Sequence, residues 1–385
     1  MDNKVVKSVL GAVALSGAAY AGPVQEVTPE AASGCGDWCA CLTDLGNPVY
    51  EGNGIINKVQ FFGRAHANYG ITTGDVNGVD FDGSDYLARR LRLGVKIDFL
   101  QNAQLVVSAN LLDDNNTFGD ARFGYSSLDV FYLKYNFGNI LGLENASVKY
   151  GRMKHKFGAE GHTSSNNLKT VERSVIGNYF YGGARPTGIK AEADFAGFHG
   201  AIGVFSTDID TELGNWDDGI AYYASLSTNV AGGTLLLDGL YNDISAGDQD
   251  VFGMEWALSA AYTTQLGNWT LLTNLLYSEE HNGDNTFGVV IMPSTYIVPD
   301  KVEFVARYEF GDSDNTNRLG LSQFAAAQSG AGLGNERHAL YVGLNYHLCG
   351  NNARLQAGIE YETAEDTLNA DADATTFWFG FKSHF

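Results

Sequence analysis

The sequence has 385 residues and a formal net charge of −21, and 44% of its residues are hydrophobic. It is rich in Gly (47), Tyr (20) and Phe (22) and has only 6 Pro, a composition typical of β-structure with tight turns. The acidity argues against nucleic acid as a partner, and no stretch reaches the roughly 18 consecutive apolar residues that indicate a transmembrane helix.

The N-terminal residues have the pattern of a secretory signal. Lys4 and Lys7 form a basic region, Val9–Ala19 is a short apolar run, and Ala19-Tyr20-Ala21 fits the cleavage rule for such signals. We therefore expect residues 1–21 to be a signal peptide. The alternative is a short N-terminal helix of a cytosolic protein.

Residues 22–55 are polar and irregular, and we interpret them as a periplasmic segment that precedes a single large domain at residues 56–385. The segment holds three of the four cysteines, and an even number of cysteines in an exported chain permits disulfides. The spacing C-x3-C-x-C matches no standard zinc pattern, so disulfides are favoured over a metal site. The pairing among the four cysteines stays open: Cys35, Cys39, Cys41 and Cys349.

Strand signals recur from residue 58 to the end of the chain. Between Leu91 and Phe99, for example, apolar residues alternate with Arg92, Lys96 and Asp98. Such alternation describes a strand with one apolar and one polar face. In a soluble sandwich the polar face points outward to water, whereas in a membrane barrel it points to water inside. Alternation alone leaves both architectures open.

The lengths of the connections favour the membrane barrel. Candidate strands begin near residues 58, 86, 103, 128, 146, 187, 199, 220, 234, 255, 269, 288, 301, 337, 353 and 376. Long links are expected near residues 70–85, 113–127, 153–185, 207–219, 242–254, 279–287, 312–336 and 363–375, with short turns between them. Short turns at one rim and long loops at the other are typical of barrels in the bacterial outer membrane.

The sequence therefore predicts an all-β fold, a transmembrane antiparallel β-barrel of 16 strands in the bacterial cell outer membrane. An even strand count places both termini at the short-turn rim, and closure removes the unpaired edges that a bilayer does not tolerate. The last strand carries aromatic residues on one face and ends in Phe385, as the recognition signal for outer-membrane barrel assembly does.

The alternation fails in one long stretch, Gly151–Phe180, which is dense in Gly, Asn, Ser and charged residues. About 30 irregular residues would be unusual inside a soluble domain. In a membrane barrel such a loop can fold inward and narrow the channel. We interpret the stretch as the long third extracellular loop, folded into the lumen as a constriction.

Basic residues gather on this stretch and on the strands beside it. Those expected at the pore constriction are Lys149, Arg152, Lys154, Lys156, Lys169 and Arg173. Those expected on the lumen wall are Arg90, Arg92, Lys96, Lys134 and Lys190. Cations at a narrow point raise the local concentration of anions. The alternative is that they only solvate the wall and pair with Asp98, Glu160, Glu172 and Glu192.

Three motifs resemble the phosphate-selective porin O/P family: ARRLRLGV, DVFYLKY and KHKFGAEGHTSSNNLKTVERSVIGNYF. The similar part spans roughly residues 58–195. The resemblance implies a trimeric, 16-stranded porin for passive diffusion, with lysines at the constriction and an arginine ladder. It assigns Arg90 and Arg92 to the ladder, and to the loop it assigns Lys154, Arg173, Glu172 and Thr163-Ser164-Ser165.

The chain departs from the family in two respects. Lys156 stands where the family motif has proline, and the second half of the chain is strongly acidic. Residues 58–190 carry 16 Lys and Arg against 12 Asp and Glu, whereas residues 191–385 carry 6 against 27. General porins oppose a basic wall to an acidic one across the lumen, and this split is compatible with that arrangement as well.

No enzyme motif is present: there is no G-x-S-x-G, H-E-x-x-H or P-loop. His155 and His162 lie near Glu160, but no third ligand is evident, so a metal or acid–base site is not expected. We expect no enzymatic activity, no cofactor and no bound metal.

The predicted function is passive diffusion of small hydrophilic solutes, with inorganic anions such as phosphate as the candidate preference. The expected partners are outer-membrane lipid and two further copies in a homotrimer. One alternative is a non-conducting surface barrel, an adhesin or envelope-structural protein that uses its acidic extracellular loops. A secreted soluble β-protein is another.

Overall fold

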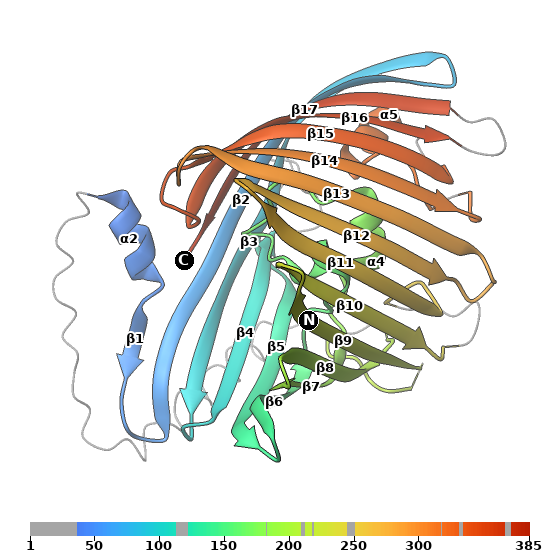
Figure 1. The fold of residues 1–385 in the computed structure, drawn as a ribbon. Coiled ribbons are helices and arrows are strands. Elements are labelled where there is room, and N and C mark those ends of the chain that lie inside the picture. Colours follow the sequence, from blue (N-terminus) through green and yellow to red (C-terminus); the bar gives the residue numbers. More distant parts are fainter. Residues whose placement is uncertain are drawn as a thin grey trace.

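Sixteen strands, β2 to β17, form one closed antiparallel barrel in the computed structural model (Figure 1). The structure describes residues 37–112, 122–181, 183–208, 212–217, 219–244, 251–316, 318–330, 334–365 and 371–385. Each strand pairs with its neighbour in the chain, and the barrel closes where β17 pairs with β2, from Ala372 opposite Val76 to His384 opposite Arg64. The predicted 16-stranded barrel is confirmed. The expected signal peptide and Cys35 lie outside the described residues.

The strand bounds follow the predicted order closely. The strands are β2 (Ile56–Val76), β3 (Val79–Phe99), β4 (Ala103–Leu112), β5 (Phe123–Ile140), β6 (Leu143–Arg152), β7 (Thr187–Phe195), β8 (Phe198–Ser206), β9 (Ile220–Val230), β10 (Gly233–Asn242), β11 (Trp256–Leu266), β12 (Trp269–Glu279), β13 (Asn285–Val298), β14 (Val302–Ser313), β15 (Glu336–His347), β16 (Ala353–Glu365) and β17 (Asp371–His384).

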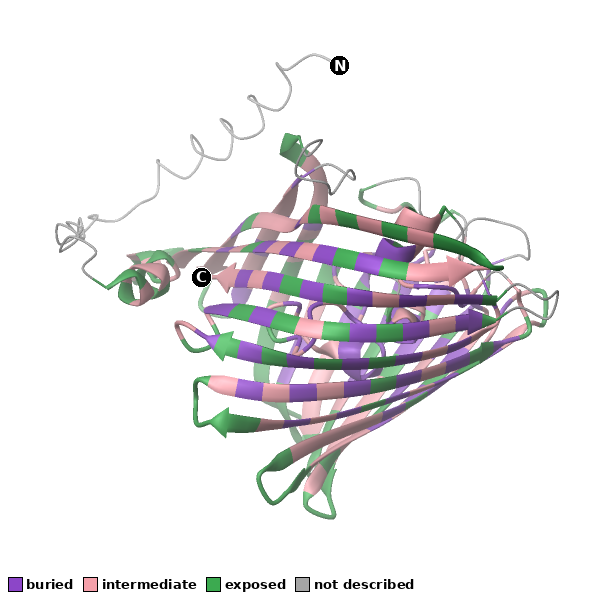
Figure 2. Ribbon diagram, turned by 90° about the horizontal axis from the view of Figure 1, so that it is seen from above, coloured by how far each residue is buried: buried purple, intermediate pink, exposed green. Residues whose placement is uncertain are grey.

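The wall is apolar on its exposed face and polar on its buried face. In β16, Leu355 and Ile359 are each 47% exposed, whereas Arg354 and Glu360 are 2% and 3% exposed. The same alternation makes the stripes on the strands in Figure 2. A soluble domain buries its apolar side chains, so this inverted pattern is that of a membrane barrel with a polar interior. Among the described residues, no helix is long and apolar enough to cross a bilayer.

One expected loop is wrong. Residues 70–85 were expected to form a long link, but β2 and β3 continue through them to a two-residue turn at Asn77-Gly78, the light-blue hairpin at the top of Figure 1. Both turn residues have positive φ, 55° and 79°, which is the geometry that Asn-Gly favours in tight hairpins. Aspartates stand on both sides of this turn, so the sequence there resembles a polar loop and its strand pattern was not recognised. Another link is shorter than expected, because β5 already begins at Phe123.

The N-terminal segment is more ordered than its composition indicated. Residues 38–45 form helix α2 (Trp38–Leu45), and β1 (Pro48–Glu51) pairs with the first residues of β2. Asp37 caps α2 by accepting a hydrogen bond from Cys39 N. The segment lies at the short-turn rim, because Gln60 Nε2 of β2 donates to Gly46 O at 2.5 Å.

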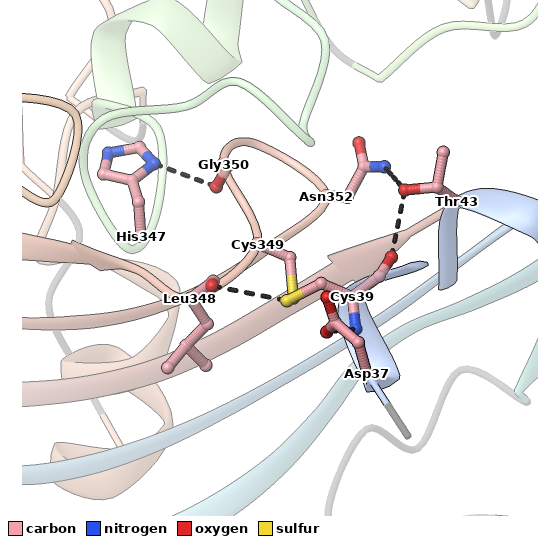
Figure 3. Close-up of a disulfide and its surroundings, with 8 residues drawn as sticks. All are labelled: Asp37, Cys39, Thr43, His347, Leu348, Cys349, Gly350 and Asn352. Atoms are coloured by element: carbon pink, nitrogen blue, oxygen red, sulfur yellow. Dashed lines mark hydrogen bonds between the residues drawn. A yellow bond between two sulfur atoms is a disulfide. The ribbon is translucent and has the colours of Figure 1, made fainter. Parts of the chain in front are cut away.

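A disulfide joins this segment to the far end of the chain. Cys39 of α2 is bonded to Cys349 in the turn between β15 and β16, across 310 residues of sequence (Figure 3). A short chain of hydrogen bonds runs beside it: Asn352 Nδ2 donates to Thr43 Oγ1 at 3.4 Å, and Thr43 Oγ1 donates to Cys39 O at 3.0 Å. Cys41 also takes part in a disulfide. The cross-link spans the seam at which β17 meets β2.

We expect the double variant Cys39→Ser plus Cys349→Ser to unfold more easily. Removing a cross-link between residues so far apart gives the unfolded chain more freedom, which typically costs about 2–4 kcal/mol of stability. Guanidinium unfolding of the detergent-solubilised protein, followed by tryptophan fluorescence, measures the change. An unchanged midpoint would mean that strand pairing alone holds this rim.

Candidate functional site

The link between β6 and β7, residues 153–186, folds back against the barrel wall. It contains two short helices, α3 (Gly158–His162) and α4 (Val175–Tyr181). These helices contact strands β10 to β14, which are distant from β6 and β7 in the chain. The 153–186 segment therefore crosses to the opposite part of the wall.

Wall side chains hold the starts of both helices. Ala159 N donates to Asn274 Oδ1 of β12 at 2.7 Å, and Ile176 N donates to Glu309 Oε1 of β14 at 2.8 Å. The first amides of a helix lack partners within it, and here the wall supplies them. Asn274 and Glu309 both belong to the buried polar face of the wall.

The stretch between the two helices is held by strands β15 to β17. Its backbone carbonyls at Leu168, Lys169 and Thr170 accept hydrogen bonds from the wall, and irregular backbone in a barrel needs such partners. The donors are Asn345 of β15, Arg354 and Gln356 of β16, and Lys382 of β17.

Glu172 connects the segment to the first two barrel strands. Its carboxylate accepts from Arg89 Nε of β3 at 2.8 Å and from Asn68 Nδ2 of β2 at 2.6 Å. Burial alone would raise the pKa of Glu172, but Arg89 and Arg90 lower it to about 2. The segment thus has polar contacts with β2 and β3 as well as with β10 and strands β12 to β17.

One side of the segment packs in an apolar cluster. Met153, Phe157, Ile176 and Phe180 lie among side chains of the neighbouring wall, including Phe205 of β8. The rings of Phe157 and Phe180 are stacked, with centroids 6.1 Å apart. The space between the segment and strands β8 to β13 is therefore filled by side chains.

The other side of the segment lines a cavity of about 850 Å³ that it shares with strands β2 to β7. Among the described residues, eleven Lys and Arg side chains and one acidic side chain, Asp129, line this cavity. The basic residues are Arg64, Arg89, Arg90, Arg92, Lys96, Lys149, Lys154, Lys156, Arg173, Arg185 and Lys190.

The structure brings together eight of the residues that the sequence selected. Four of them were predicted for the constriction: Lys149, Lys154, Lys156 and Arg173. The other four were predicted for the lumen wall: Arg90, Arg92, Lys96 and Lys190.

Three selected residues do not line the cavity. Arg152 donates to the carbonyls of Leu128 and Glu212, and Lys169 pairs with Glu303 Oε1 at 2.6 Å. Lys134 lies opposite Lys149 in the pairing of β5 with β6.

Sequence reasoning missed Arg89 because a β-bulge interrupts the alternation. Opposite His66–Asn68 of β2, the register of β3 shifts by one residue. Arg89 and Arg90 consequently both line the cavity, although they are adjacent in the chain. The sequence shows the run of arginines, but it does not show the bulge that turns Arg89 toward the cavity. Arg64 and Arg185 were also not selected.

Only some of these cations are paired with carboxylates. Asp129 binds Arg92 and Arg185, each at 2.9 Å, and Glu192 binds Lys149 at 2.6 Å and Lys190 at 3.0 Å. Arg89 binds Glu172. Within the part of the chain that the structure describes, the remaining six have no carboxylate oxygen within 4.0 Å: Arg64, Arg90, Lys96, Lys154, Lys156 and Arg173.

Crowding of like charges changes the protonation of Lys154. Burial, followed by the charges of Arg173, Arg185 and Lys156, lowers its pKa to about 5. The pKa of Lys156 is also lowered, by burial and by Lys190. A lysine with a lowered pKa is neutral above that pH and charged below it. Lys154 therefore gains its charge in mildly acidic solution.

If ions pass through this cavity, we expect the ratio of anion to cation permeability to rise as the pH falls from 7 to about 4.5, because Lys154 becomes charged in that range. The ratio of anion to cation permeability, measured at several pH values, tests this. In Lys154→Met the rise should be smaller, since only the carboxylates of the rim loops still titrate. Identical pH profiles for the two proteins would contradict the assignment.

The two histidines near this segment do not form a metal site with Glu160. His155 is buried between aromatic rings, among them Phe252 and Tyr223, and its pKa is lowered to about 3 by burial. His162 Nε2 lies 2.9 Å from Asp238 Oδ1. Across the described ranges of the chain, no group of three or more His, Cys, Asp or Glu side chains is arranged to hold a metal ion.

Comparison with known proteins places the chain in a family. A family model described as phosphate-selective porin O and P matches residues 59–290, which is more than half of the chain. A search of curated proteins gives no match.

Solved outer-membrane proteins share the fold at low sequence identity. OmpT of Vibrio cholerae has a TM-score of 0.51 and 13% identity, over 87% of this chain and 99% of that one. The outer membrane channel DcaP of Acinetobacter baumannii has a TM-score of 0.54 and 12% identity, and the match covers 87% of this chain and 99% of DcaP. OmpF of Salmonella typhi, solved in complex with daunomycin, has a TM-score of 0.53 and 14% identity, and the match covers 84% of this chain and 98% of OmpF.

Proposed function

Because the chain belongs to the phosphate-selective porin O and P family, and is thus a porin of the bacterial outer membrane, we propose that it passes inorganic anions, phosphate among them, in preference to cations. Solutes diffuse passively through such a channel, and we propose no catalytic step. Outer-membrane lipid is the proposed neighbour of the exposed apolar face.

The charge of the cavity carries this proposal. Among the described residues, eleven Lys and Arg side chains and one acidic side chain surround it, although the whole chain has a net charge of −21. A concentration of one charge sign in a narrow, partly desolvated space raises the local concentration of ions of the opposite sign. The local sign, and not the sign of the whole protein, decides which ions enter.

Four buried acidic residues of the second half do not oppose this basic wall. Glu303, Glu309, Glu360 and Glu362 are buried, and none of them lines the cavity. They bind Lys169, Arg307 and Arg337, and Glu309 also holds the start of α4. This distribution favours an anion channel over the general-porin arrangement of two opposed walls.

We further propose that the 153–186 segment lies in the lumen and leaves an off-centre passage along strands β2 to β7. Two observations support this. The segment forms hydrogen bonds with polar side chains of β2, β3, β10 and β12 to β17, and its apolar side fills the space next to strands β8 to β13. The basic cavity is the space that remains beside it.

Reversal potentials in a planar bilayer test the proposal. In a KCl gradient, the purified porin should give the sign expected for chloride permeation, and added phosphate should reduce the chloride current at pH 7. A reversal potential of zero or of the opposite sign would refute the anion preference. Absence of current steps would instead favour the non-conducting surface barrel.

We also propose that the porin is a homotrimer, as the family resemblance implies. A shallow apolar depression of about 770 Å³ on strands β5 to β11 supports close contact between barrels. Several small outward-facing side chains line it, such as Ala191, Ala193, Gly200 and Ala224. Light scattering of the detergent-solubilised porin measures the number of chains.

A further inference from the structure

Tyr181, the last residue of α4, lies at the centre of a group of basic side chains. Lys154 Nζ is 4.6 Å from the centroid of its ring, Arg173 Cζ is 4.8 Å away, and Arg185 Cζ is 6.0 Å away. Arg185 Nη1 also donates a hydrogen bond to the hydroxyl of Tyr181 at 2.9 Å. All four residues line the basic cavity.

The other partners of these cations are mostly uncharged. Arg173 donates to the carbonyls of Glu160 and Thr163, at 3.0 and 2.8 Å, and Lys154 Nζ lies 3.5 Å from the same Thr163 oxygen. Neither side chain is among the described residues that pair with a carboxylate. Only Arg185 has such a partner, Asp129.

An aromatic ring can hold cations without neutralising them. The face of a tyrosine ring carries partial negative charge from its quadrupole and attracts Lys and Arg within about 6 Å. A carboxylate in the same place would also gather the cations, but its negative charge would cancel part of their attraction for an anion. The ring therefore reduces mutual repulsion while the net positive charge of the cavity is kept.

We propose that Tyr181 is the positioning residue of the anion pathway: its ring holds Lys154, Arg173 and Arg185 together on the cavity wall so that their charges act jointly on a permeating anion. This inference rests on the proposed function and deepens it. Tyr181 itself is only 4% exposed, so it acts through the cations and not by contacting the anion.

The surroundings of Tyr181 fix its ring in place. Gly161 of α3 lies against it, and a Cβ at that position would be 3.3 Å from Tyr181 Cδ2. Tyr181 of α4 thus packs against α3 within the 153–186 segment. A fixed ring keeps the three cations at constant separations, which a flexible side chain could not do.

The test compares three variants: Tyr181→Leu, which removes the ring; Tyr181→Phe, which keeps the ring but loses the hydroxyl; and Phe180→Leu. Phe180 is the matched control, because it is an equally buried aromatic residue of α4 that stacks on Phe157 and touches none of the three cations. Heat-modifiable migration on gels confirms that each variant folds.

The measured quantity is the concentration of inorganic phosphate that halves the chloride current at pH 4.5, where Lys154 is charged as Arg173 and Arg185 are. We expect Tyr181→Leu to raise it about fivefold, which corresponds to the loss of one or two cation–π contacts. Tyr181→Phe should stay within about twofold of the unmodified porin, and Phe180→Leu should behave as the unmodified porin does.

Three outcomes would overturn the inference. They are a Tyr181→Leu channel equal to the unmodified porin, a Tyr181→Phe channel as impaired as Tyr181→Leu, and a Phe180→Leu channel with the same loss. A failure of the proposed function is distinguishable, because phosphate would then have no effect on the chloride current of the unmodified porin.

Discussion

Replacing both Lys154 and Arg173 by glutamate is expected to turn the channel from anion-preferring to cation-preferring. Both side chains line the cavity on the 153–186 segment, and neither is held by a carboxylate among the described residues. Two unit charges about 4 Å apart interact by about 1 kcal/mol in water and about 4 kcal/mol in a partly desolvated site. The ratio of anion to cation permeability should therefore fall by at least about tenfold, which a reversal potential in a KCl gradient measures as a change of sign.

A matched control separates local charge from net charge. Lys58→Glu plus Lys301→Glu changes the formal charge by the same amount, but neither lysine lines the cavity. Lys301 is exposed in the turn between β13 and β14, and Lys58 lies near Glu51 at the same rim. This control should leave the sign of the reversal potential unchanged. Equal shifts in both double variants would mean that selectivity follows the net charge of the protein.

Acidic and basic residues have different structural roles in this barrel. Carboxylates of strands β14 and β16 are paired with arginines of the wall, and that of Glu309 also anchors the 153–186 segment. Strands β2 to β7 contribute seven basic residues to the cavity, and among the described residues three of them have no carboxylate partner: Arg64, Arg90 and Lys96. An acidic protein can thus present a basic passage, since Coulomb interactions act over short distances in salt solution.

Alternation of apolar and polar residues was sufficient to predict the barrel. From Leu340 to Tyr346 in β15, for example, every second side chain is apolar and exposed, and a period of two identifies such a strand directly. The hairpin at Asn77-Gly78 was missed because aspartates stand on both sides of the turn, which made its strands look like a polar loop. Its Asn-Gly pair was the available signal.

The site was less accessible to sequence reasoning, because its contacts join distant residues. Lys169 was selected for a constriction, but its charge is paired with Glu303, 134 residues away. Arg89 was passed over because a bulge changes which face it takes. No pattern in the sequence indicates that Tyr181 contacts three cations. The roles of Lys154, Lys156 and Arg173 in selectivity stay predictions until they are measured.

Arg337→Met is expected to destabilise the porin by about 3–5 kcal/mol. Arg337 of β15 lies between two carboxylates, with Nε 3.1 Å from Glu309 Oε1 and Nη2 2.6 Å from Glu362 Oε2, and all three side chains are 0% exposed. Removing the arginine leaves two uncompensated buried charges, which is strongly unfavourable. Unfolding in guanidinium, followed by tryptophan fluorescence in detergent, gives the change in free energy.

The triple variant Arg337→Met, Glu309→Gln, Glu362→Gln is the control for this result, since it also removes the two carboxylate charges that Arg337→Met leaves unpaired. A glutamine oxygen can still accept from Ile176 N at the start of α4 and from Ser322, the N-cap of α5 (Gln323–Ser329). The triple variant should therefore recover most of the lost stability, because a buried ion network can often be replaced at little net cost. If it stayed as unstable as Arg337→Met, lost packing and not stranded charge would explain the effect. Open-channel noise should likewise be larger in Arg337→Met than in the triple variant, because the carboxylates that Arg337 neutralises also hold α4 and α5 in place.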